Sequence, residues 1–560
     1  MTDSPNNSPA RRDLTGIARK LLILGLDGAT WNVLDPLMQS GRMPNLARIV
    51  AGGTSGILRS TVPPITPAAW TTFLTGRNPG DHGIIDFERY DVRTNALSFN
   101  TTSALRHVRS IWRILGDKGF RVGSVNVPMT YPPVPVNGFL ISGFEAVTTR
   151  SAFTHPPDLK ERILQRWPDF SFKNKWRRKT FGGDRLYAEN LADITRSFDQ
   201  GADVLQFCCD DFGWDVAMIV FKMVDNLQHK IWRYIDPRTR DRFARRCAMA
   251  EDCFAALDRV IGRLTDYARA HDAHVFMMSD HGHGSLEGKA QPNLMLRDWG
   301  YLALREGGAQ SRTRTRHSIA RLFRKKGKFA AGNFSLTDDL AVDFSRTRAA
   351  VMHAGMAGFL YINLKGRQET GIVESSDYES LRDELAERFA ATTCVDPTGR
   401  RIKVFDAVHK PEQLYGCSRD GRHWLPDLML CPTPRLAVVR KIRGRQPVQW
   451  IPLHRMEGTH RPEGIYALYG DGIPAGQRLD TDIINATPTI LAMLGVFVPD
   501  DMTGCVVEEI FDPPLVYDTE HATPTDPAQP DAANEPAPSV YSADDMAKLT
   551  ERLADLGYLE

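Results

Sequence analysis

Short apolar runs that end in an aspartate recur along this chain. "LLILGLDG" ends with Asp27, "VAMIVFKMVDNLQH" runs into Asp225, and "AHVFMMSDHGHG" reaches Asp280. Such runs, bounded by glycine or polar turns, are typical of strands buried on both faces of a parallel sheet. Ligands of open α/β sheets bind just beyond the carboxyl ends of the strands. We therefore expect the three carboxylates in one crevice, where a shared cation would relieve their repulsion.

Eight segments carry this strand pattern, and helical periodicity lies between several of them. Apolar residues about three to four positions apart make the segment 241–270 the clearest helix. Alternating strands and helices predict a doubly wound α/β fold, in which helices cover both faces of a mostly parallel central sheet. The predicted strands are 21–27, 121–127, 138–142, 216–224, 273–279, 358–363, 427–431 and 465–469.

Residues 18–510 are predicted to form one domain of this class, with two segments inserted into it. Residues 150–200 include a basic and aromatic stretch, and residues 303–345 carry many cations and few strand signals. Two interpretations of the second insertion stay open. Its cations form a solvated face, or they belong to a mobile lid that attracts an anionic substrate.

Both ends of the chain lie outside the predicted domain. Residues 1–17 are polar, and we expect them to be disordered. Residues 511–540 are rich in Pro, Ala, Asp and Thr, a composition typical of linkers. In the segment 541–560, Ser542 is a candidate helix cap and the residues after it carry apolar periodicity. It predicts a short helix that docks on its own subunit or on a neighbour in a homo-oligomer.

The overall composition limits the classes of protein to which the chain can belong. Hydrophobic residues make up 42% and charged residues 25%, as in ordinary globular proteins. A net charge of +2 gives no reason to expect a stable nucleic-acid complex. No apolar run approaches the roughly 20 residues needed to span a bilayer. The apolar run after the polar N-terminus is short and ends in Asp27, which is not typical of a signal peptide, so we expect a cytoplasmic protein. Eight cysteines without a C-x-x-C pair are typical of buried or free thiols in a reducing compartment.

Histidines accompany two of the three strand-end aspartates. His229 follows Asp225 by four positions, and His281 is adjacent to Asp280. A further histidine, His460, lies in the glycine-flanked stretch "MEGTHRPEG". Carboxylates combined with imidazoles are typical ligands of Zn²⁺ or Mn²⁺. Each residue alone is better explained as structural, but their combination predicts a metal site.

A candidate nucleophile lies in the stretch "TPAAWTTFLTG". Thr66 at the N-cap, Pro67 at the first helical position and Gly76 after the last turn predict a helix with ordinary end signals. The structural interpretation is that Thr66 only caps this helix. The functional interpretation is that its hydroxyl, at the anion-attracting end of a helix, is ionised against a metal and attacks phosphorus. This stretch alone favours the cap.

Several motifs in a fixed order resemble those of the alkaline phosphatase superfamily, most closely its type I phosphodiesterase/nucleotide pyrophosphatase branch. They are "LGLDG", "TPAAWTTFLTG" with "HGIIDF", "DNLQH", "SDHG" and "GTH", spread over about 20–300 and 350–510. The resemblance implies an alkaline-phosphatase-like catalytic domain that hydrolyses small phosphoric esters through a threonyl-phosphate on Thr66. It also implies two divalent ions, Zn²⁺ or alternatively Mn²⁺. Their ligands would be Asp225, His229 and His460 for one ion, and Asp27, Thr66, Asp280 and His281 for the other.

The sequence departs from this family at one position that bears on the substrate. Nucleotide pyrophosphatases carry an Asn shortly after "HGI", whereas the corresponding residue here is Phe87. A phosphodiesterase is favoured largely by resemblance, with Phe87 and Trp70 as candidates for an apolar wall. The alternatives are a phosphomonoesterase and a member that only binds metal or a phosphorylated ligand. His82 and His283 are assigned supporting or structural roles near the motifs.

Overall fold

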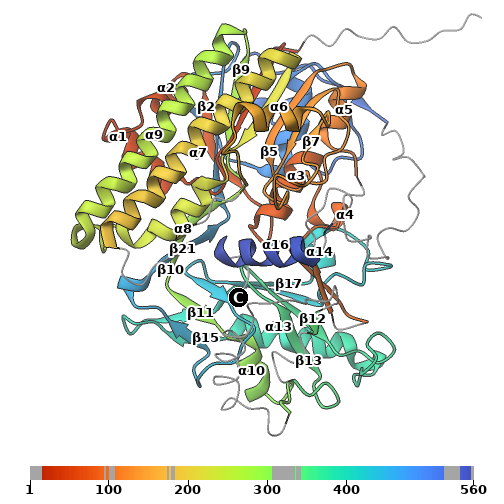
Figure 1. The fold of residues 1–560 in the computed structure, drawn as a ribbon. Coiled ribbons are helices and arrows are strands. Elements are labelled where there is room, and N and C mark those ends of the chain that lie inside the picture. The colour runs from red at the N-terminus through yellow and green to blue at the C-terminus, as the bar shows by residue number, and fades with distance from the viewer. Residues whose placement is uncertain are drawn as a thin grey trace, which may run out of the picture.

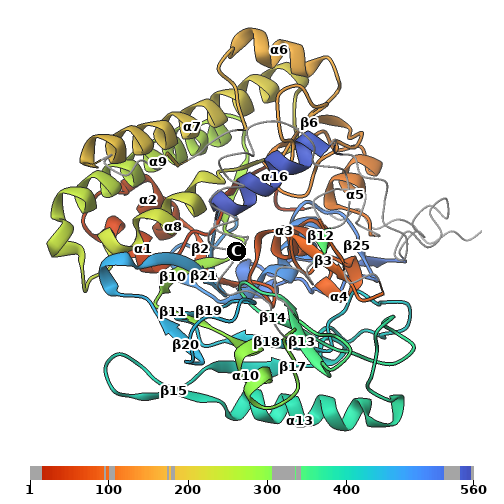
Figure 2. The same cartoon turned by 60° about the horizontal axis from the view of Figure 1, so that its bottom comes forward.

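The computed structural model describes residues 16–93, 96–99, 108–172, 176–177, 183–305, 334–335, 342–521, 541 and 543–556. The chain forms a larger and a smaller lobe (Figure 1 and Figure 2). A ten-stranded sheet in the larger lobe has the order β23-β2-β22-β9-β1-β8-β5-β6-β7, with β24 also pairing with β2. Its strands are β1 (Leu21–Gly25), β2 (Thr54–Arg59), β5 (Val122–Val127), β6 (Gly138–Ser142), β7 (Thr154–His155), β8 (Val216–Val220), β9 (His274–Met278), β22 (Glu463–Tyr469), β23 (Gln477–Arg478) and β24 (Thr481–Asp482).

The five central strands β9, β1, β8, β5 and β6 run parallel, and β7 and β22 are antiparallel to their neighbours in this group. Alternate residues of β1 contribute to different cores. Leu22 and Leu24 face one core, and Leu21 and Ile23 face the other. Both faces are therefore apolar, which explains the continuous hydrophobic runs in the sequence.

Helices cover both faces of the sheet, so the prediction of a doubly wound α/β fold is confirmed. One core includes α1 (Trp31–Gln39), α2 (Pro44–Gly52), α6 (Leu159–Arg166), α7 (Gly183–Phe212), α8 (Met223–Ile235) and α9 (Ala244–Ala270). The opposite core includes α3 (Thr66–Thr75), α5 (Ile111–Asp117) and α15 (Ala486–Met493).

Two of the predicted strands lie outside the central sheet. They are β14 (Gly358–Ile362) and β18 (Leu428–Pro432), which pair in a four-stranded antiparallel sheet with β13 (Ala349–His353) and β17 (Phe405–His409). This sheet, with α10 (Pro292–Asp298) and α13 (Tyr378–Ala391), builds the separate core of the smaller lobe. An apolar run shows that a strand is buried but not which sheet it joins.

Shorter elements connect or flank the two lobes. A two-stranded sheet of β10 (Gly282–Leu286) and β21 (Glu457–Arg461) follows directly from β9 and leads into β22. The others are β3 (Glu88–Asp91), β4 (Ala96–Phe99), β11 (Gly288–Ala290), β12 (Phe334–Ser335), β15 (Thr393–Val395), β16 (Arg401–Lys403), β19 (Leu436–Val438), β20 (Val448–Trp450), β25 (Val498–Pro499), β26 (Thr519–Glu520), α4 (Pro79–His82), α14 (Pro411–Tyr415) and α16 (Ala543–Leu556).

Several predicted boundaries shift in the structure. The strand expected at 216–224 ends at Val220, and α8 already begins at Met223. Much of the expected insertion 150–200 consists of β7, α6 and the first part of α7 in the larger lobe. Most of the insertion 303–345, residues 522–540 of the expected linker, and Ser542 lie outside the described residues. Among the helices that the structure describes, none is long and apolar enough to cross a membrane.

Candidate active site

Three aspartates lie at the carboxyl ends of neighbouring parallel strands. Asp27 follows β1, Asp280 follows β9 on one side of it, and Asp225 lies in the first turn of α8 after β8 on the other side. All three side chains are fully buried. The order of the strands therefore brings the three carboxylates to the same edge of the sheet, as we expected from the sequence.

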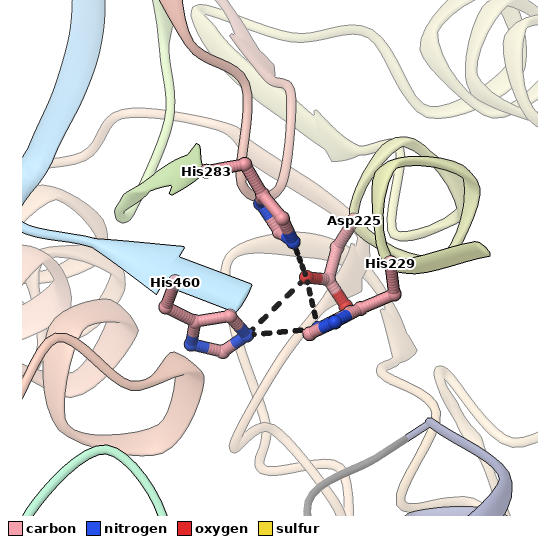
Figure 3. Close-up of side chains that lie close together, drawn as sticks. All are labelled: Asp225, His229, His283 and His460. Carbon is pink, nitrogen blue, oxygen red and sulfur yellow. Dashed lines mark hydrogen bonds and ion pairs between the residues drawn. The ribbon is translucent and has the colours of Figure 1, made fainter. Parts of the chain in front are cut away.

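Three imidazoles converge on one oxygen of Asp225 (Figure 3). The distances from Asp225 Oδ1 are 3.2 Å to His229 Nε2, 3.4 Å to His460 Nε2 and 3.4 Å to His283 Nε2. His229 lies one helical turn after Asp225 on α8, whereas His283 and His460 are paired across the β10–β21 sheet. One donor atom from each of the four residues lies within 4.8 Å of the others, so the group could hold a metal ion.

A second group surrounds His281. Its Nε2 lies 3.4 Å from Thr66 Oγ1, 3.4 Å from Asp280 Oδ2 and 3.8 Å from Asp27 Oδ1. The amide of Gly28 donates a hydrogen bond of 3.0 Å to the other oxygen of Asp280. The structure thus brings all seven predicted site residues together in two adjoining groups.

Thr66 occupies the first position of α3 rather than the cap. Ile65 is the N-cap residue, and Gly76 follows the last turn of the helix with φ 65°. Thr66 is completely buried with its hydroxyl beside His281. The end signals of the helix were right to within one residue, but the interpretation of Thr66 as a cap is wrong.

The carboxylates of the site differ strongly in their affinity for protons. Burial raises the pKa of Asp27 to about 7, although Lys222 opposes this. Burial, with the nearby charge of Asp27, raises the pKa of Asp280 well above its usual range. Burial alone would also raise the pKa of Asp225, but Lys222 and His229 hold it well below the ordinary value. Asp225 is therefore the most firmly ionised of the three.

Burial also lowers the pKa of three histidines in the site. The pKa values of His281 and His283 fall well below the ordinary value, and that of His460 is lowered as well. These imidazoles are therefore neutral near pH 7, and a neutral imidazole is the form that binds metal ions.

Lys222 is a functional candidate that the sequence analysis missed. Its Nζ lies 2.6 Å from Asp225 Oδ2 and 3.3 Å from Asp27 Oδ1, so one ammonium bridges the two groups. Burial would lower its pKa, but the two carboxylates raise it above the ordinary value. Its position three residues before Asp225 was the sequence feature that pointed to a role in the site. Its contact with Asp27 is visible only in the folded structure.

Two aromatic residues considered as a substrate wall are buried in the core. Trp70 is fully buried and donates a 3.1 Å hydrogen bond from Nε1 to Asp27 Oδ2, so it orients a site carboxylate. Phe87 packs edge-to-face on Phe144 at 5.9 Å, and the ring of Phe144 lies 5.6 Å from Lys222 Nζ. Phe144 rather than Phe87 is the apolar ring beside the charged groups.

The donor set fits divalent metal ions. Asp280 Oδ2 and His283 Nε2 are buried and have no hydrogen-bond partner within the described part of the chain. Buried polar atoms are normally hydrogen-bonded, and metal coordination is a common way to satisfy those that are not. Aspartates and neutral histidines are ligands of Zn²⁺ and also suit Mn²⁺.

The match to a known family identifies the chain as a hydrolase of phosphoric ester bonds. Residues 21–463 match the family model of type I phosphodiesterase / nucleotide pyrophosphatase, and the chain belongs to this family, as its motifs indicated. It is similar in fold to phosphonoacetate hydrolase from Sinorhizobium meliloti 1021, solved in complex with phosphonoformate. The two share 14% identity with a TM-score of 0.51, over 85% of this chain and 97% of that chain. No curated protein sequence matches this chain.

Proposed function

We propose that the protein is a phosphodiesterase that works through a threonyl-phosphate on Thr66, beside two divalent metal ions. The observation that carries the proposal is the position of the Thr66 hydroxyl. It lies at the N-terminus of α3 and 3.4 Å from His281 Nε2, a donor atom of the second ligand group. A helix N-terminus also favours the negative charge of a phosphoryl group.

The ligand groups divide the site between two ions, Zn²⁺ in preference to Mn²⁺. When bound, such ions lower the pKa of a neighbouring hydroxyl and neutralise charge on phosphoryl oxygens. Their ligands are Asp225, His229 and His460 on one side, and Asp27, Thr66, Asp280 and His281 on the other.

The chain's own residues carry out a double displacement. The oxygen of Thr66 bonds to phosphorus while the bond from phosphorus to the leaving oxygen breaks. The threonine proton passes to solvent, and the leaving oxygen takes up a proton. Water then attacks the threonyl-phosphate, the bond to Thr66 breaks, and the threonine regains its proton, which gives net retention at phosphorus.

A small phosphoric diester is the preferred substrate. Family membership and the apolar ring of Phe144 beside Lys222 support this choice, because a diester has a second substituent that needs an apolar surface. The eight cysteines are free thiols, which supports a reducing, cytoplasmic location.

The test is the hydrolysis of bis(p-nitrophenyl) phosphate and p-nitrophenyl phosphate by the full-length protein loaded with Zn²⁺ or Mn²⁺. We expect faster turnover of the diester. Thr66→Ala should lower kcat by at least about 10⁴-fold, because the nucleophile is lost. Preference for the monoester would favour the phosphomonoesterase, and no turnover of either ester would favour a binding role.

The matched control is Thr71→Ala, a second fully buried threonine on α3 that lies outside both ligand groups. It should keep near-normal activity and show that truncating a buried threonine of this helix is tolerated. Near-normal rates in metal-loaded Thr66→Ala would contradict the threonyl-phosphate mechanism.

A further inference from the structure

His283 lies in the Asp225 group although the family motifs assign it no role as a ligand. It is fully buried, and its Nε2 lies 3.4 Å from Asp225 Oδ1 without a hydrogen-bond partner among the described residues. Figure 3 shows its ring pointing at the same carboxylate oxygen as His229 and His460. A buried ring nitrogen aimed at a ligand group is an observation that a purely structural role leaves unexplained.

The tautomer of His283 is fixed by its other nitrogen. Nδ1 lies 3.0 Å from the carbonyl oxygen of Gly28, which can only accept, and 3.5 Å from the amide nitrogen of Gln228. The shorter contact assigns the proton to Nδ1, so Nε2 presents a lone pair. His229 and His460 are arranged in the same way. Their Nδ1 atoms donate to the carbonyls of Gly458 at 2.8 Å and Pro64 at 3.0 Å. Backbone partners of this kind orient metal-binding histidines.

Four distances among the donor atoms match a tetrahedral shell. Bonds of about 2.0–2.1 Å from a central ion imply distances of about 3.3–3.4 Å between neighbouring donors. The three distances from Asp225 Oδ1 are 3.2, 3.4 and 3.4 Å, and His229 Nε2 lies 3.1 Å from His460 Nε2. Removing His283 from this set would leave one corner without a protein donor.

Two features of the backbone allow His283 to reach this corner. The register of β10 and β21 pairs it directly with His460, so both rings lie on one face of the small sheet. Gly28 has φ +69°, and a Cβ there would lie 2.8 Å from the Cε1 of His283. Only glycine leaves room for the imidazole at that position.

We propose that His283 is a fourth protein ligand of the ion held by Asp225, His229 and His460. Asp225, His229, His283 and His460 would then supply one carboxylate and three imidazoles to that ion. This inference rests on the proposed metal site. It adds a ligand that the family motifs do not include.

The test replaces the native ions by one equivalent of Co²⁺ in the full-length protein and counts the paramagnetically shifted, exchangeable imidazole N–H signals in proton NMR. Each histidine bound through Nε2 contributes one Nδ1–H signal. Three signals are expected in the wild-type protein, and His283→Gln should remove one of them. In parallel, competition with a chromophoric chelator should show that this variant binds Zn²⁺ at least about 100-fold more weakly.

The matched control is His82→Gln. His82 is also fully buried, but its ring nitrogens pair with the hydroxyl of Thr72 at 2.9 Å and the amide of Ile84 at 3.2 Å. The His82→Gln variant should leave the number of shifted signals and the Zn²⁺ affinity unchanged. The wild-type count needs no variant, so it decides the question even if His283→Gln fails to fold.

The outcomes separate the two proposals. Two shifted signals in the wild-type protein, or an unchanged count and affinity in folded His283→Gln, would overturn the role of His283 and leave the metal site standing. No shifted signal at all in the wild-type protein would overturn the metal site itself and the proposed function with it.

Discussion

At the scale of single residues, the site places several negative charges beside one positive charge. Three buried carboxylates lie next to one ammonium, that of Lys222, whose side chain is 11% exposed and contacts Asp225 and Asp27 directly. Leaving a buried carboxylate without its cation is costly, because it has lost its hydration. The ammonium of Lys222 therefore compensates part of the buried negative charge in the metal-free site, and bound divalent ions would compensate more of it.

Lys222→Met should destabilise the protein in the presence of a chelator. We expect the free energy of unfolding to fall by about 3 kcal/mol, since the variant leaves Asp225 and Asp27 without their nearest cation. Urea denaturation followed by circular dichroism measures this quantity. Adding Zn²⁺ should reduce the deficit, because a bound ion supplies the missing positive charge.

Lys410→Met is the control for this prediction. Lys410 also contacts two carboxylates, Asp383 at 2.7 Å and Glu379 at 3.1 Å, but both of these side chains are exposed. Its loss should cost less than about 1 kcal/mol, as is usual for surface ion pairs. Equal stability of wild type and Lys222→Met without metal would show that Lys222 does not compensate the buried charge.

At the scale of elements, apolar patterns predicted the strands but not their partners. All eight predicted strands exist, because strands that are mostly buried carry continuous apolar runs whether their neighbours are parallel or antiparallel. The pairing of β10 with β21 was not predictable, since these short strands contain mostly glycine, histidine and polar residues. That pairing places His283 opposite His460, so the third imidazole of the Asp225 group became visible only in the structure.

The C-terminal helix α16 illustrates the same limit. Its periodicity predicted a helix, and the structure shows where it docks. Leu549 is fully buried in the core of the larger lobe, and the hydroxyl of Tyr541 donates to the carbonyl of Glu145 at 3.2 Å. Figure 1 shows α16 near the boundary between the lobes. Leu549 and the partly buried Met546, which packs against the same core, thus anchor the helix to its own chain.

Leu549→Asp should release α16 from the larger lobe. A buried carboxylate without a partner costs several kcal/mol, so undocking becomes the cheaper state. Hydrogen–deuterium exchange of the peptide that contains residues 543–556 should accelerate at least about 100-fold. Ala547→Asp places the same side chain at an exposed position of α16 and should leave the exchange unchanged. Similar protection in both variants would contradict this docking.

At the scale of the whole molecule, a short segment joins the cores of the two lobes. Phe87 is part of the larger lobe's core, whereas Ile85 belongs to the core of the smaller lobe. Asp86 lies between these two residues, and Glu88 follows Phe87. Each carboxylate forms an ion pair of 2.9 Å with His353 of β13. This contact was not predictable from the sequence, because Glu88 and His353 lie 265 positions apart in the chain.

This junction should make the stability of the protein depend on pH through His353. Burial alone would lower its pKa, but Asp86 and Glu88 raise it to about 10. Because the folded state holds a proton that the unfolded chain releases near pH 6.5, the stabilisation is complete below that pH and is lost as pH rises toward 10. The difference in the free energy of unfolding between wild type and His353→Gln should therefore fall by roughly 1.4 kcal/mol per pH unit between about pH 7 and 9.5. For His409→Gln the same difference should stay flat in this window, because burial lowers the pKa of His409 and its titration lies at lower pH. A flat profile for His353→Gln as well would mean that the junction holds a neutral histidine.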